Sequence, residues 1–139
     1  MRLSAAKEMR INLGLLFLRI GLGVVFIIHG YPKLFGGPEQ WTNVGGAMSN
    51  LGIGSFHTLF GFMAGFAEFF GGIFLIFGLF TAPALVFLIS TMIVALITQI
   101  AREAGFPGIA HPLSVGLVFI ALFITGPGRF SIDHQFRKR

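Results

Sequence analysis

The sequence predicts an all-α fold, an antiparallel bundle of four transmembrane helices with both termini in the cytoplasm. Of the 139 residues, 55% are hydrophobic and only 11% are charged, whereas a soluble domain carries about 25% charged residues. The mean hydropathy is +0.86. The apolar residues also fall into separate runs of a length that suits the crossing of a bilayer. Together these observations indicate an integral membrane protein.

The expected helices follow one another along residues 12–31, 56–80, 83–100 and 109–125. A spanning helix needs about 20 apolar residues, with a range of about 17 to 25. The fourth run is short and has Pro112 near its start, where proline is tolerated, and a Gly-Pro-Gly sequence at 126–128 ends it. Few residues separate the second and third runs, so these two helices should form an antiparallel hairpin. The whole chain, residues 1–139, is expected to form a single membrane domain.

The distribution of basic residues predicts the orientation. The two tails carry Arg2, Lys7, Arg10, Arg129, Arg137, Lys138 and Arg139, and the loops of the opposite side carry only Lys33 and Arg102. An even number of spans places both tails on one side, which the positive-inside rule makes cytoplasmic. We therefore expect a multi-pass protein of the bacterial cytoplasmic (inner) membrane. Its net charge of +5 serves orientation, and no nucleic-acid partner is expected.

The chain contains no cysteine. This excludes a thiol nucleophile, a redox-active cysteine pair, iron–sulfur ligation by cysteine and disulfides. Any redox role would therefore use a bound cofactor or the chemistry of a partner protein.

Arg19 and Glu68 are charged residues inside two of the apolar runs. Glu68 is the only acidic residue of the second run and shares a stripe with Gly61, Gly65 and Gly72. This spacing places the four residues on one helix face, where small residues let another backbone approach closely. A charge in hydrocarbon is costly, so we expect both charged side chains to face the protein interior and to find a partner.

The depths of Arg19 and Glu68 predict that they form an ion pair. Arg19 should lie roughly 10 Å, and Glu68 roughly 18 Å, from the cytoplasmic ends of their helices. An extended arginine can bridge the gap of about 8 Å. Two alternatives remain: Arg19 reaching to the headgroups, or Glu68 held protonated by burial. Such a pair could fix the helix register or serve a substrate, proton or cofactor.

Polar side chains gather near the outer ends of the expected helices. This candidate outer pocket comprises His29, Lys33, His57, Gln99, Glu103 and His111. Imidazoles exchange protons near neutral pH and bind metals or haem, and a quinone head group would also suit such donors. No two histidines have the spacing of a metal motif, so we expect no metal site. Alternatively, the histidines are merely tolerated at the membrane interface.

Three segments of the chain resemble the DoxX family of small four-helix membrane proteins. They are LRIGLGVVFIIHGYPKLFG, FAEFFGGIFLIFGLFTAPAL and GPGRFSID, and the resemblance covers nearly all of residues 15–133. Arg19, Lys33, Glu68, Arg129 and Asp133 match the polar pattern of the family. The resemblance implies an accessory subunit of a membrane oxidoreductase system. Some relatives are tied to thiosulfate:quinone oxidoreduction and others to complexes with superoxide dismutase and a sulfurtransferase.

Arg129 and Asp133 follow the glycine-proline stop of the fourth helix and are expected to form a cytoplasmic anchor. Arg129 would lie at the headgroups. Asp133 would either pair with Arg129 or accept hydrogen bonds from backbone N–H groups. The segment could act as a plain helix terminator or as a docking element for a partner.

These observations lead to one functional expectation and two alternatives. The expected function is a membrane subunit or anchor of a redox complex, with a quinone-facing polar pocket and a soluble or membrane redox partner protein. The first alternative is a small proton-coupled transporter that uses Glu68 as a relay. The second is a membrane assembly factor without a ligand of its own. The sequence leaves open whether the chain is itself an enzyme, and its small-residue stripes could also serve a homo-oligomer.

Overall fold

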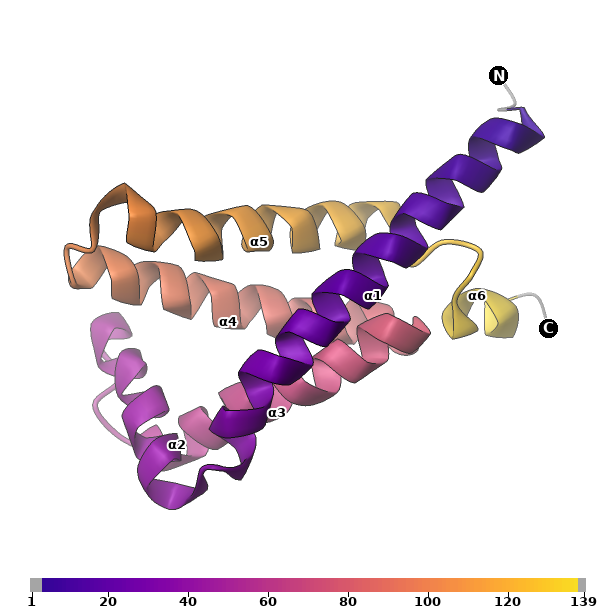
Figure 1. Cartoon of the computed structure of the whole chain (residues 1–139). Helices are drawn as coiled ribbons and strands as arrows, with labels where there is room; N and C mark the ends of the chain where they lie inside the picture. The colour runs from indigo at the N-terminus through magenta and orange to yellow at the C-terminus, as the bar shows by residue number, and fades with distance from the viewer. Residues whose placement is uncertain (1–3, 138–139) are drawn as a thin grey trace.

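The computed structural model describes residues 4–137, which are mainly helical and contain no strand (Figure 1). In chain order the elements are α1 (Ala5–Phe35), α2 (Gly37–Gly45), the 3-10 helix η1 (Gly46–Leu51), α3 (His57–Phe77), α4 (Thr81–Ala101), α5 (Gly105–Thr125) and α6 (Ile132–Arg137). Within this part of the chain, α1, α3, α4 and α5 are long and apolar enough to cross a membrane. The prediction of an all-α bundle with four transmembrane helices is confirmed.

The first helix is longer than the sequence predicts, at both ends. It begins at Ala5 rather than at residue 12. The residue before it, Ser4, caps this end, because its side chain accepts a hydrogen bond from the backbone N–H of Lys7. It continues through Pro32 to Phe35 rather than ending at residue 31. Proline removes one backbone hydrogen bond, and the packing of Leu34, two residues after Pro32, against α3 offsets this cost. Lys33 is consequently a helical residue.

The other long helices also differ in their ends from the predicted ranges. The second spanning helix, α3, stops at Phe77, because Gly78 adopts a left-handed backbone with φ +62°. α4 starts at Thr81 rather than at residue 83, and α5 starts at Gly105 rather than at residue 109. The short turn between α3 and α4 makes these helices a hairpin.

Glycines bring α1 and α3 together in an antiparallel pair. A Cβ placed on Gly23 would lie 2.6 Å from the carbonyl oxygen of Gly72, and a Cβ placed on Gly72 would lie 2.6 Å from that of Gly23. Farther along, Gly65 meets the backbone of Leu34. Apolar lipid gives no hydrophobic drive for helices to associate, so such close backbone packing is a main source of their stability.

The connection between α1 and α3 folds back onto α3. Gly61 of α3 packs under the backbone of Trp41, and Gly45 of α2 packs against the backbone of His57. The Trp41 indole N–H donates to the carbonyl of Leu34 at 3.0 Å. These contacts fix α2 and η1 beside the first half of α3.

The apolar core lies between α1, α3, α4 and α5. It consists of Phe26, Leu75, Leu85, Leu88, Met92, Phe119 and Leu122. The rings of Phe26 and Phe119 meet edge to face at 4.9 Å. Away from this core, α3 and the α4–α5 pair diverge (Figure 1), and η1 reaches α4 again through a 3.3 Å hydrogen bond from Asn50 to Thr98. This divergence creates the space for the candidate site.

Candidate functional site

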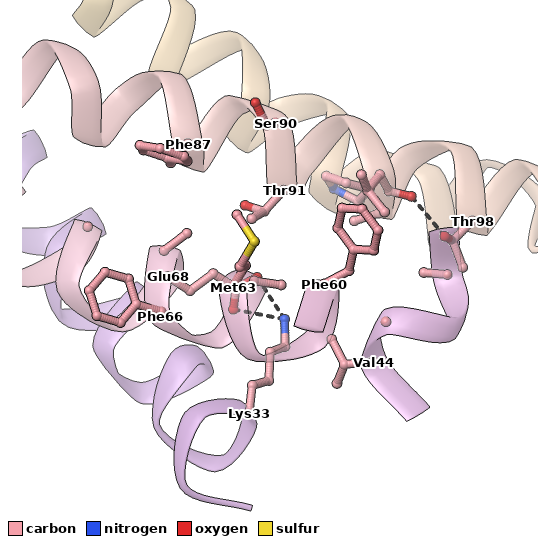
Figure 2. Close-up of a pocket in the computed structure, with 18 of the residues that line it drawn as sticks. Lys33, Val44, Phe60, Met63, Phe66, Glu68, Phe87, Ser90, Thr91 and Thr98 are labelled. Carbon is pink, nitrogen blue, oxygen red and sulfur yellow. Dashed lines mark hydrogen bonds and ion pairs between the residues drawn. The ribbon is translucent and has the colours of Figure 1, made fainter. Parts of the chain in front are cut away.

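A groove of about 1100 Å³ lies between α3 and α4. Its walls are mainly apolar and include Phe60, Met63, Phe66 and Phe87, which Figure 2 shows around the cavity. Residues from the end of α1, the end of α2, η1 and the start of α5 complete the lining. Ligand pockets in proteins are typically apolar clefts with a few well-placed polar groups, so the polar groups of this groove are the first candidates for function.

Two charged groups of the groove wall, Lys33 and Glu68, form an ion pair in which the ammonium contacts both carboxylate oxygens (Figure 2). The Lys33 ammonium donates to Oε1 of Glu68 at 2.7 Å and to Oε2 at 2.8 Å. The side chain of Glu68 is 3% exposed and that of Lys33 is 31% exposed. Hydrogen bonds between two ionised groups are short and strong, so this contact can hold a charge pair inside the apolar bundle.

The local sequence explains why Lys33 reaches Glu68. Buried positions on α1 recur at residues 19, 23, 26, 30 and 34, and this stripe faces the glycines of α3. Gly30 packs against the backbone of Phe69, and Gly65 packs against Leu34. Helix α1 therefore ends directly beside the middle of α3, where Glu68 projects.

The predicted ion pair between Arg19 and Glu68 is wrong. The Arg19 guanidinium is fully buried and donates instead to the carbonyl oxygens of Leu75 at 3.2 Å, Ile76 at 3.5 Å and Phe130. The cause is the register of α1: Arg19 lies level with Leu75, which is about 10 Å along α3 from Glu68. Carbonyl groups at the end of a helix attract cations, so those of Leu75 and Ile76 near the end of α3 accept from Arg19 in place of a carboxylate. The Nε of Arg19 has no partner among the described residues.

Asp133 accepts backbone hydrogen bonds, which is one of the two roles predicted for it. Its carboxylate accepts the N–H groups of Phe80 and Thr81, both at 2.9 Å, and its own N–H donates to Gly78 at 2.9 Å. Asp133 therefore caps α4 and binds the C-terminal segment to the α3–α4 turn. Arg129 does not pair with Asp133; it lies 3.6 Å from Glu8, and both side chains of that pair are exposed.

The structure brings together only part of the predicted outer pocket. Lys33, Gln99 and His111 line the groove. The Gln99 amide donates to the carbonyl of Gly108 at 3.3 Å. The His111 ring stacks on that of His29 at 6.0 Å, and this contact links α1 to α5.

The other three predicted residues are not part of the groove lining. His29 bonds the carbonyl of Val25 through Nδ1 at 2.9 Å. His57 is hydrogen bonded to Ser49 and to the carbonyl of Ile53, at 3.2 Å each. Glu103 is exposed in the turn after α4. Across residues 4–137, no three side chains of histidine, aspartate or glutamate lie together as a metal site would need.

The DoxX family model matches residues 14–100, which is more than half of the chain. The chain belongs to the DoxX family. An uncharacterized membrane protein of Mycobacterium tuberculosis is 33% identical over 88% of this chain and 80% of that protein. An uncharacterized protein of Haemophilus influenzae is 30% identical over 90% of this chain and 92% of that protein. No solved structure matches the chain.

The part of this DoxX protein that matches the family contains the groove residues of α3 and α4, together with Lys33 and Glu68. The sequence analysis selected both residues but assigned them to different sites. The missed signal was the continuation of the buried stripe of α1 past Pro32, which places Lys33 beside the packing face. Thr91 and Thr98, seven residues apart on α4, were also missed as lining residues of the groove.

Proposed function

We propose that this DoxX protein is a membrane subunit or anchor of an oxidoreductase complex in the bacterial cytoplasmic membrane, and that the groove is its quinone-facing pocket. The observation that carries the proposal is the Lys33–Glu68 pair on the wall of a large apolar groove. A quinone combines a polar carbonyl head with a long apolar tail. The groove offers a matching environment to each part.

The absence of cysteine from the chain supports the role of a subunit. This protein has no thiol with which to bind sulfur covalently or to exchange electrons. Covalent chemistry on a sulfur substrate would therefore belong to a partner protein. The DoxX protein would hold that partner at the membrane and give it access to quinone.

The proposal is tested by purifying the full chain from membranes in mild detergent, with mass spectrometry of the copurified proteins and of the extracted lipids. We expect an oxidoreductase partner and bound quinone. Met63→Trp, which places a larger side chain in the groove, should retain the partner and lose the quinone. Phe17→Trp changes an exposed residue of α1 outside the groove and should retain both.

Two results would contradict the proposal. Purification without any redox partner or quinone would exclude the redox role. Copurification of immature client proteins, again without quinone, would favour a membrane assembly factor.

A proton-coupled transporter is the second candidate, and the burial of Glu68 beside the groove favours it. Ionisable residues inside membrane proteins frequently serve as proton relays. In proteoliposomes, a transporter would show substrate-dependent proton flux that Glu68→Gln abolishes. Unchanged flux in that variant would exclude Glu68 as the relay.

A further inference from the structure

We infer that the groove binds a neutral lipid whose head group accepts a hydrogen bond, a ketone or quinone-type carbonyl on a long apolar chain, and that Lys33 donates this bond. Glu68 acts as a positioning residue that holds the Lys33 ammonium at the groove wall. The inference rests on the groove of the proposed function, but it requires neither a redox partner nor electron transfer. It names the chemical class of the ligand and the atom that recognises it.

The number of donors on Lys33 leaves one N–H for a ligand. An ammonium group carries three N–H donors. Among residues 4–137, the acceptors of the Lys33 ammonium are the two carboxylate oxygens of Glu68. Because Lys33 also lines the groove and its side chain is 31% exposed, the third N–H is available to an acceptor that enters the groove.

The charge of the pair favours a neutral head group. Lys33 and Glu68 cancel one another, so this part of the groove wall has no net charge. An anionic head would gain the attraction of Lys33 but would also meet the carboxylate of Glu68, within 3 Å of the same ammonium. A net charge buried in an apolar site is costly. A carbonyl oxygen can accept the third N–H without breaking the pair.

The groove has room for a long chain. Its lining residues on α4 extend from Pro83 to Gln99, which corresponds to about 24 Å of helix. Thr91 lies in the middle of this stretch and faces the cavity together with Met63 and Glu68 (Figure 2). A head group at Lys33 therefore has apolar wall on either side along which its tail can lie.

The exposure of the wall residues indicates entry from the bilayer. Met63, Phe66 and Phe87 line the groove and are 45%, 47% and 54% exposed. Side chains that are half exposed on a spanning helix contact lipid. The groove therefore opens sideways, and a lipid-soluble ligand can enter it without crossing water.

The groove offers one rival position for a head group. Arg102 and His111 line it near the α4–α5 turn, where an anionic head could bind. Both residues are exposed, whereas Glu68 is buried and holds Lys33 in one geometry. We therefore assign the head group to Lys33, and the experiment separates the two positions.

The test uses the full chain in mild detergent, labelled by a photoreactive alkyl diazirine. Three competitors with the same unbranched chain are compared: a ketone, an alkane and an alkyl sulfonate. We expect the ketone to block labelling at a concentration about tenfold or more below that of the alkane, because it gains a hydrogen bond to a charged donor. The sulfonate should compete no better than the alkane.

Variants identify the donor. The double variant Lys33→Met/Glu68→Met removes both charges together, so it keeps the balance of charge that folding needs, and it should bind ketone and alkane equally. Lys33→Arg should retain the preference for the ketone. Met63→Trp should weaken the binding of all three competitors, whereas Phe17→Trp, outside the groove, should leave the binding of each unchanged.

Two outcomes would overturn the inference. One is a sulfonate that competes better than the ketone, which would place an anionic head at Arg102. The other is a preference for the ketone that survives in the double variant. The two proposals can fail separately. If the purified protein prefers the ketone through Lys33 but carries no quinone from the membrane, this inference is supported and the proposed redox role is contradicted.

Discussion

Lys33 and Glu68 depend on one another because neither charge is tolerated alone inside the bundle. The carboxylate of Glu68 is almost fully buried, and its hydrogen-bond partner among the described residues is the Lys33 ammonium. Removal of one member of a buried pair leaves an uncompensated charge, whereas replacement of both by apolar residues is often neutral. Single and double substitutions of the pair therefore separate the cost of one unpaired charge from the net contribution of the ion pair to stability.

We predict that Lys33→Met lowers the free energy of unfolding by about 3–5 kcal/mol, because it leaves Glu68 buried and unpaired. The double variant Lys33→Met/Glu68→Met should return close to the wild type. Chemical denaturation in detergent micelles, followed by the near-ultraviolet signal of Trp41, measures both changes. A double variant as unstable as Lys33→Met alone would show that the loss of stability does not come from an unpaired Glu68 carboxylate.

The choice of partner for Glu68 could not be predicted from the sequence. Sequence spacing identified Arg19, Lys33 and Glu68 as special, and all three are in polar contacts in the structure. The register between α1 and α3 decides which of them meet. That register depends on the three-dimensional fit of the glycines of α1 into those of α3, which helical periodicity along either chain segment does not specify.

At the scale of elements, the pairing of α1 with α3 depends on glycines, which have no side chain to keep the two backbones apart. Gly23 and Gly72 face one another so closely that a methyl group on either would meet the backbone of the other helix. Backbone cannot move aside as the end of a flexible side chain can. The two helices would have to separate, and the Lys33–Glu68 contact farther along the same interface would lengthen.

We predict that Gly72→Ala lowers the free energy of unfolding by about 1–3 kcal/mol through overpacking. Gly21→Ala is the matched control, because a Cβ at Gly21 meets nothing within 4 Å; its stability should be unchanged or slightly raised by the better helix propensity of alanine. Denaturation of the two variants under the same conditions gives the comparison. Equal stability of both would mean that α1 and α3 are not in close backbone contact.

The C-terminal segment is joined to the α3–α4 turn by Asp133. This carboxylate satisfies the N–H groups of Phe80 and Thr81 at the start of α4, and Phe80 has an unusual left-handed backbone with φ +46°. We predict that Asp133→Ala lowers the free energy of unfolding by about 0.5–2 kcal/mol, which is typical for the loss of a helix cap. Gln135→Ala, an exposed position of the same short helix, should have no effect on the same measurement.

At the scale of the whole molecule, the sequence predicts the number of spanning helices but not the groove between them. Lengths and hydropathy of the runs depend on composition, and the structure has the four long helices that composition indicates. The groove exists because α4 and α5 diverge from α3 beyond the core around Phe26 and Phe119. In the sequence, the phenylalanine and methionine residues of its walls look the same as ordinary lipid-facing residues, so no local pattern identifies them as groove residues.

Orientation is the remaining property of the whole molecule on which the functional proposals depend. The excess of basic residues in the tails predicts that both termini are cytoplasmic and that the α4–α5 turn faces outward. The absence of cysteine makes this directly measurable, since single cysteines can be introduced without background. Ala6→Cys, Gln135→Cys and Ala104→Cys place one thiol near each terminus and one in the turn, all at exposed positions.

We predict that a membrane-impermeant maleimide labels Ala104→Cys in spheroplasts, and that it labels Ala6→Cys and Gln135→Cys only after lysis. The reason is that the tails carry more arginine and lysine than the outer loops, and loops rich in these residues stay in the cytoplasm. The reverse pattern would place the tails outside, together with the Arg19 and Asp133 contacts, and would move a soluble redox partner docked on them to that side. Labelling of the two termini on opposite sides would contradict the four-span topology itself.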